Sequence, residues 1–192
     1  MTVSSTRCCR RVDLAGALLA ILFAFSAALA YAQGIDVRRA ALNVAEDGYL
    51  LDAQFDIALT NTLEEALNKG IPLYFRLEFE LTRPRWYFFN DRVAYLQQEY
   101  RLSYNALTRQ YRLGVGNLHQ NFGSVGEALE VMSRIRRRQD IEAGALRKDT
   151  TYTAALRMRL DTSQLPKPFQ LSAVTSREWN VGSEWYRWLV AL

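Results

Sequence analysis

Alternation of hydrophobic and polar residues predicts that most of this chain forms β-strands. The pattern is clearest from Leu73 to Thr82, where Leu and Phe alternate with Tyr, Arg, Glu and Thr. A period of two is typical of a strand with one buried face. A shift of phase at Arg38 and Arg39 predicts a bulge in the first strand. The same period predicts further strands over residues 35–44, 51–59, 92–104, 109–115 and 151–160, and a short last strand over 169–174.

Two segments carry the signals of a helix start. Thr62 precedes Glu65 by three positions, and Ser124 precedes Glu127 in the same way. Each pair matches the capping box, in which both side chains accept hydrogen bonds from N–H groups of the first turn. We expect the second helix to continue through Arg138, because arginines in a last turn complement the helix dipole.

The order of these elements predicts a mainly β (α+β) fold. Strands follow one another through short loops, without the strand–helix–strand alternation of a parallel sheet. We expect an antiparallel, sandwich-like domain over residues 33–192, with two short helices at its ends and a stiff connector over residues 164–168. An open antiparallel sheet with both helices on one face is the alternative.

Residues 1–32 have the pattern of a signal peptide helix. Arginines precede an apolar stretch from residue 14 to residue 30, which ends in small residues. Cleavage is expected after Ala30 or after Ala32. The alternative is an uncleaved anchor, because these 17 residues lie at the lower edge of the roughly 17–25 that span a bilayer. Both interpretations export the domain to the periplasm, and the second leaves it attached to the inner membrane.

Removal of this segment changes which chemistry is available. It carries both cysteines, Cys8 and Cys9, so the mature domain has no thiol for a disulfide, a nucleophile or a metal. The net charge falls from +4 to +2. We therefore expect no general attraction to nucleic acid.

No residue pattern predicts catalysis, a cofactor or a metal site. His119 is the single histidine, and we interpret it as a loop or surface residue. Glu78 and Glu80 have a spacing compatible with a glycosidase pair. The preferred interpretation is that they are solvent-facing charges, paired with Arg76 or with an arginine on the next strand.

Aromatic and arginine clusters are the features that point to binding. Four consecutive aromatics follow two arginines at a strand connection, and three of the four tryptophans lie in the last 14 residues. A helix after Ser183 would place Trp185, Trp188 and Leu189 on one face. The clusters are either core or a contact surface for a protein or an anionic lipid headgroup. The candidate partner-binding residues are Arg83, Arg85, Trp86, Tyr87, Arg136, Arg137, Trp185 and Trp188.

Several motifs together resemble a known family. They are the strand from Pro72, Arg-Pro-Arg-Trp-Tyr from Arg83, the segment from Tyr100, Leu-Pro-Lys-Pro from Leu165, and the end around Trp185. In this order they resemble the proteobacterial domain of unknown function 4390, over nearly the whole mature chain. The resemblance implies an exported protein of a Gram-negative bacterium and supplies no catalytic or binding residue. Members are often encoded beside a nitrogen-regulation-type sensor kinase, which hints at envelope sensing.

We therefore expect a non-enzymatic periplasmic protein that binds an envelope partner through aromatic and arginine-bearing loops. The partner could be a sensor kinase ectodomain. The alternative is a binder of a lipid or hydrophobic small molecule, which needs an apolar cavity. A remote alternative is an envelope glycan hydrolase acting through Glu78 and Glu80.

Overall fold

The computed structural model describes residues 34–45, 48–84, 91–139, 146–147 and 150–191, with the backbone alone for residues 137–139. Residues 33–192 form one compact unit. The expected signal peptide and the candidates Arg85, Trp86 and Tyr87 lie outside the described residues. Among the described residues, no helix is long and apolar enough to cross a membrane.

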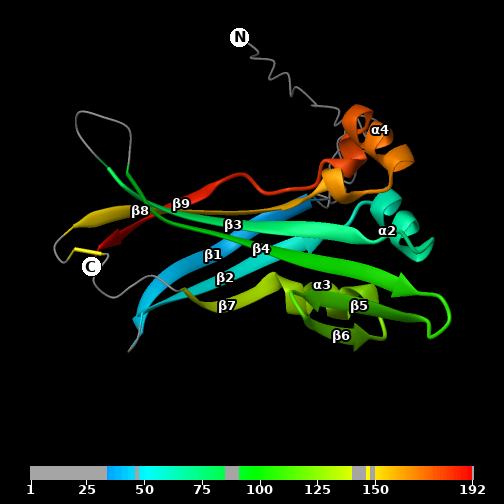
Figure 1. Ribbon diagram of the computed structural model, residues 1–192, viewed down its shortest axis with the longest axis horizontal. Coiled ribbons are helices and arrows are strands. Elements are labelled where there is room, and N and C mark those ends of the chain that lie inside the picture. Colours follow the sequence, from blue (N-terminus) through cyan, green and yellow to red (C-terminus); the bar gives the residue numbers. More distant parts are fainter. Residues whose placement is uncertain (1–33, 46–47, 85–90, 140–145, 148–149, 192) are drawn as a thin grey trace, which may run out of the picture. The chain divides into compact units, whose positions relative to one another are not determined.

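Antiparallel strands in two sheets make up most of the described chain (Figure 1). A three-stranded sheet has the order β1-β2-β7 and a six-stranded sheet has the order β6-β5-β4-β3-β8-β9. The first sheet consists of β1 (Gly34–Ala45), β2 (Gly48–Ala58) and β7 (Arg134–Gln139). The second consists of β3 (Leu73–Arg83), β4 (Asp91–Asn105), β5 (Gln110–Val115), β6 (Leu118–Phe122), β8 (Thr151–Leu160) and β9 (Tyr186–Ala191).

Three short α-helices and two 3-10 turns complete the described part. The helices are α2 (Asn61–Asn68), α3 (Val125–Ser133) and α4 (Lys167–Thr175). The turns are η1 (Thr162–Gln164) and η2 (Arg177–Trp179).

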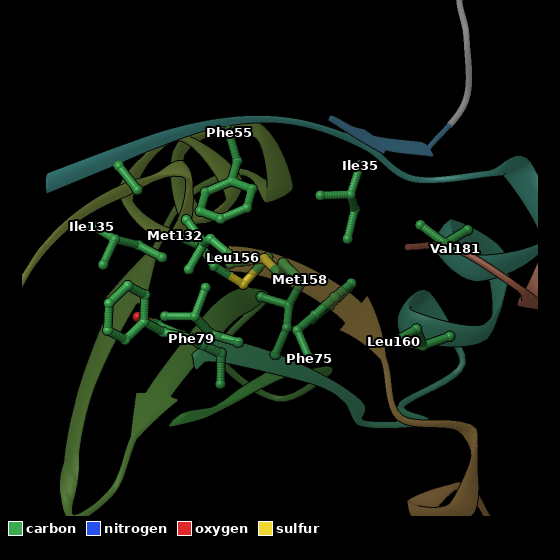
Figure 2. Packing of buried hydrophobic residues seen from close by; sticks show 14 of the residues in the cluster. Ile35, Phe55, Phe75, Phe79, Met132, Ile135, Leu156, Met158, Leu160 and Val181 are labelled. Atoms are coloured by element: carbon green, nitrogen blue, oxygen red, sulfur yellow. The ribbon is translucent and has the colours of Figure 1, made fainter. Parts of the chain in front are cut away.

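One hydrophobic core includes residues of both sheets. Figure 2 shows Phe55 of β2 with Phe79 of β3 and Leu156 of β8 in the same cluster. Phe75, Leu77 and Phe79 are at most 1% exposed. Because each buried Leu or Phe contributes about 1.5–3 kcal/mol, these alternating residues stabilise both sheets.

The strand periodicity is confirmed where it is strongest. The residues of β8 that were expected to point inward are buried, from Tyr152 to Leu160. The predicted bulge is confirmed too, since the β1–β2 register shifts between Val37 and Arg39. The mainly β, antiparallel prediction is therefore correct, and the described part of residues 33–192 contains three α-helices where two were expected.

The second helix ends earlier than predicted. It stops at Ser133, and Arg134 begins β7, which pairs with β2. Ile135 lies opposite Ala53 in this register and is buried, whereas Arg136 is exposed. The free edge of β2 supplies hydrogen-bond partners to the segment, and pairing there buries Ile135. These gains outweigh the dipole effect on which the helical prediction depended.

Near the C-terminus the predicted strand over residues 169–174 is wrong, and the condition of a helix after Ser183 is not met. Residues 169–174 belong to α4, with Pro168 in its first turn, where a missing N–H costs nothing. The segment after Ser183 is not helical, because β9 pairs with β8. Trp188 lies opposite the buried Ala154, whereas Leu189 is 73% exposed, so the two do not share a face.

Candidate functional site

The six-stranded sheet has one face on the core and one face away from it, which we call the outer face. In β3 its side chains are those that alternate with the buried Leu and Phe residues. The register extends this set across the neighbouring strands. The outer face includes Tyr74, Arg76, Glu78, Glu80, Thr82, Arg92, Tyr95, Gln97, Glu99, Arg101, Ser103, Arg112, Gly114, His119, Asn121, Thr153, Ala155, Arg157, Arg159, Arg187 and the exposed Leu189.

Glu78 is buried near the middle of this face. It is 4% exposed and lies opposite Arg157 in the β3–β8 register. Arg157 donates a hydrogen bond to its Oε2, and Arg159 donates one to Oε1 at 3.2 Å. Burial alone would raise the pKa of Glu78, but the two guanidinium hydrogen bonds outweigh it and hold that pKa below its usual value. Glu78 is thus an ionised structural group.

The residues before β9 cover this ion pair. The guanidinium of Arg157 lies 4.3 Å from the ring centroid of Trp185, a cation–π geometry. Gly182 forms a backbone bridge with Arg159, and a Cβ at Gly182 would lie 2.8 Å from the Cβ of Arg159. Ser183 Oγ accepts a hydrogen bond from the Met158 N–H at 3.0 Å. The absence of a side chain at Gly182 lets this segment approach β8.

A second network continues along the same face. Arg76 forms an ion pair with Asp161, which also accepts hydrogen bonds from Ser163. Burial would raise the pKa of Asp161, but hydrogen bonds from Ser163 and Gln164 and the charge of Arg76 lower it. Gln164 also donates to Glu99. These contacts fix the side chains in the middle of the face.

The arginines of the outer face fall into two groups. Four of them pair with carboxylates: Arg76 with Asp161, Arg92 with Glu80, and both Arg157 and Arg159 with Glu78. Within the described part of the chain, Arg101, Arg112 and Arg187 form no ion pair, and all three are exposed. The second group is therefore available to an external anion.

A hollow of about 450 Å³ lies over β4, β5 and β6. Gly114 lines it, and its register neighbours Arg101 and His119 carry long side chains where Gly114 has none. We therefore call it the Gly114 hollow. Arg101 stands in its wall with the Arg101 guanidinium 5.8 Å from the ring centroid of Tyr74. Its remaining lining residues are Gln98, Glu99, Ser103, Arg112, Gly116, Leu118 and His119.

A second hollow, of about 420 Å³, lies over β3, β8 and the start of β9. Ala155 is the small residue of its lining, so we call it the Ala155 hollow. Arg187 and Trp185 line it together with the Arg92–Glu80 pair, whose closest atoms are 3.4 Å apart. Charged and polar side chains make up most of the lining residues of both hollows, which suits a charged partner more than an apolar ligand.

The proposed binding residues that the structure describes lie in both sheets and do not gather in one place. Arg83 ends β3 and pairs with Asp91 at 2.5 Å. Arg136 and Arg137 lie on β7, in the other sheet. Trp185 is half-buried, and its ring stacks against the guanidinium of Arg157.

Trp188 behaves as a core residue more than as a contact residue. It is half-buried on β9, and its ring centroid lies 6.3 Å from that of Phe79. A second ring, that of Tyr186, lies 5.8 Å away. Of the proposed aromatic candidates in the described part, Trp185 alone lines a hollow of the outer face.

Sequence reasoning missed the three unpaired arginines. Arg101 and Arg112 lie in segments whose period of two predicts strands. The same alternation places both side chains on the face that points away from the core. His119 was expected in a loop or on the surface; it is exposed and lies on β6, paired with Gly114. Strand pairing, which the sequence does not state, brings these residues together.

The alternatives based on catalysis or metals gain no geometric support. Glu78 is buried and ionised, whereas a glycosidase acid needs a raised pKa and access to substrate. Glu80 pairs, as predicted, with an arginine of the next strand, Arg92. Glu78 pairs instead with arginines of β8, and its predicted exposure to solvent is wrong. Among the described residues, no group of three or more His, Cys, Asp or Glu side chains is placed to hold a metal ion.

Comparison with known proteins identifies one similarity. A family model described as "Domain of unknown function (DUF4390)" matches residues 32–189. No curated protein and no solved structure gives a significant match.

Proposed function

This chain belongs to the DUF4390 family, a domain of unknown function, and from its geometry we propose that it is a non-enzymatic envelope protein that binds an acidic protein partner. The binding surface is the outer face of the six-stranded sheet. The observation that carries this proposal is the presence there of three exposed arginines, Arg101, Arg112 and Arg187, without a carboxylate partner in the described part of the chain.

The composition of the face supports a protein interface. Arginine, tyrosine and tryptophan are enriched among the residues that dominate binding energy at such interfaces. Tyr74 and Trp185 lie beside the two hollows and stack on arginines. Removing water from an exposed guanidinium on binding costs free energy, which an ion pair with a carboxylate offsets. The complementary partner surface is therefore acidic.

The ion pairs beneath the surface support its role as a rigid platform. Arg157, Arg159 and Arg76 are held by Glu78 and Asp161, so they are unavailable to a partner without breaking buried contacts. A rigid sheet loses little conformational entropy on binding. We assign these residues to structure and the unpaired arginines to recognition.

The proposed location is the periplasm, through the signal peptide expected at residues 1–32, with anchoring by residues 14–30 as the alternative. The ectodomain of a sensor kinase fits as the partner, because the family resemblance implies gene neighbourhood with such kinases. That link is associational.

Photo-crosslinking in the cell tests the proposal. A photoreactive amino acid is placed at Gln97 or Tyr95 on the outer face, and at Asn43 or Asp52 on the exposed side of the three-stranded sheet. The full chain is expressed with its own leader. We expect one and the same protein adduct from both outer-face positions and none from the other two, with an acidic segment at the crosslink.

A variant in which Arg101, Arg112 and Arg187 are all replaced by Gln serves as the specificity control. It should be exported at the normal level and lose the adduct. Adducts from the three-stranded sheet alone, or no adduct from any of the four positions, would overturn the proposal.

A further inference from the structure

A row of cross-strand neighbours crosses four strands of the outer face. Tyr74 on β3 lies opposite Arg101 on β4, which lies opposite Gly114 on β5, which lies opposite His119 on β6. Three of the four carry long side chains that rise from the sheet. Gly114 carries none, and the hollow of about 450 Å³ lies at this gap. A glycine inside a strand often marks a place where another group approaches the backbone closely.

The walls of the Gly114 hollow present two guanidiniums. Arg101 lies over the ring of Tyr74 at 5.8 Å, and Arg112 donates from Nε to Asn121 Oδ1 at 3.1 Å. Both contacts orient the side chain and leave guanidinium N–H groups for another acceptor. Within the described residues neither arginine meets a carboxylate in an ion pair. Planar guanidiniums of this kind bind carboxylates in bidentate geometry.

One carboxylate of the protein also lines the hollow. Glu99 lies opposite Arg76 in the register and accepts a hydrogen bond from Gln164. The two arginines exceed it by one positive charge. A singly charged carboxylate neutralises this excess, whereas a doubly charged phosphate would leave one negative charge uncompensated in the hollow and would lose more hydration energy on entering it.

We propose that the Gly114 hollow is an anion site that receives a side-chain carboxylate from the acidic segment of the partner, held by Arg101 and Arg112. This inference rests on the proposed function and names the group recognised at that surface. Gly114 contributes by being small, since any larger residue there would occupy the space into which the carboxylate enters.

The single histidine provides a reporter inside the site. His119 is exposed and lines the Gly114 hollow, so its imidazole resonances report on this place alone. The experiment titrates the protein, purified as the cell processes it, with blocked pentaglutamate peptide at fixed pH and low salt. Blocked pentaglutamine peptide and inorganic phosphate are the matched probes.

We expect a saturable shift of the His119 signals with pentaglutamate and none with pentaglutamine. Phosphate should act only at concentrations about tenfold higher or more. Binding of phosphate at equal or lower concentration, a response to both peptides, or a response to neither would overturn the assignment.

Substitutions locate the binding. Gly114→Leu should weaken pentaglutamate binding about tenfold or more, and Arg101→Gln or Arg112→Gln about tenfold each. A Cβ at Gly114 meets no atom closer than 3.7 Å, so Gly114→Ala provides a milder variant that keeps the fold. Ala155→Leu, which fills the other hollow, and Arg136→Gln, on the other sheet, are the matched controls and should change binding by less than about twofold.

Equal losses in the controls would contradict the assignment to this hollow. The two proposals can fail separately. If pentaglutamate does not bind while the crosslinks from Gln97 remain, the anion site is wrong and the binding surface stands. If the crosslinks are absent, the proposed function fails whatever the titration of His119 gives.

Discussion

Glu78 of β3 and Arg157 of β8 face each other in register across the six-stranded sheet and form an ion pair. Arg157 then stacks on Trp185. The carboxylate is 4% exposed, so the pair replaces the water that Glu78 loses on folding. Removing either partner leaves the other charge partly buried, which is costly.

The first prediction concerns acid. Because the pKa of Glu78 is lower in the folded protein than in the unfolded chain, the unfolded chain takes up the proton first as pH falls. The stabilisation by this group is therefore fully present above pH about 4.5, the ordinary pKa of a Glu side chain, and is lost as pH falls below it. In Glu78→Gln the free energy of unfolding should fall by about 2 kcal/mol at pH 7, because the charged hydrogen bonds to Arg157 and Arg159 are lost.

The same variant should depend less on pH between about pH 5 and pH 2, with some dependence remaining because the pKa of Asp161 is lowered as well. Urea denaturation at several pH values measures both effects. If the free energy of unfolding of Glu78→Gln changed with pH as steeply as that of the unmodified protein, the role given to Glu78 would be refuted.

The second prediction compares two glycines. Gly182→Ala should lower the free energy of unfolding by about 1–3 kcal/mol, because its Cβ would lie 2.8 Å from the Cβ of Arg159 and push the Trp185 segment from β8. Gly126→Ala, in α3, meets open space and should stabilise the protein by about 0.5–1 kcal/mol. Thermal denaturation of the two variants decides, and similar effects would refute the close approach at Gly182.

The alternation of hydrophobic and polar residues predicts which segments form strands, but it does not predict which strands pair with each other. The alternation in β3 and β8 identifies their buried faces, because each residue's burial follows from its own position in the strand. The strand nature of Arg134 to Gln139 depends on the free edge of β2, about 80 residues earlier, which no local pattern contains. The same holds for the candidate site, where Tyr74, Arg101 and His119 meet only through pairing.

The third prediction distinguishes two threonines at the start of α2. The sequence pattern favoured Thr62 as the cap, but Thr60 Oγ1 accepts from the Leu63 N–H at 3.3 Å and donates to the Glu178 carbonyl at 2.9 Å. Thr60→Ala should therefore lower the free energy of unfolding by about 1–2 kcal/mol. Thr60→Ser, which keeps the hydroxyl, should lower it much less. Thr62→Ala loses one exposed hydrogen bond to the Glu178 side chain and should cost less than about 0.5 kcal/mol. Chemical denaturation of the three variants tests the order, and a larger loss for Thr62→Ala would reverse the assignment.

The central claim is that the unpaired arginines of the outer face, and not positive charge in general, recognise the partner. Its most direct test is the affinity of the crosslinked partner for two triple variants that lose the same charge. One replaces Arg101, Arg112 and Arg187 by Gln, and the other replaces Arg39, Arg134 and Arg136, which lie on the three-stranded sheet. We predict a loss of about hundredfold or more for the first and less than about threefold for the second. Equal losses for the two variants, or no loss for the first, would contradict the account.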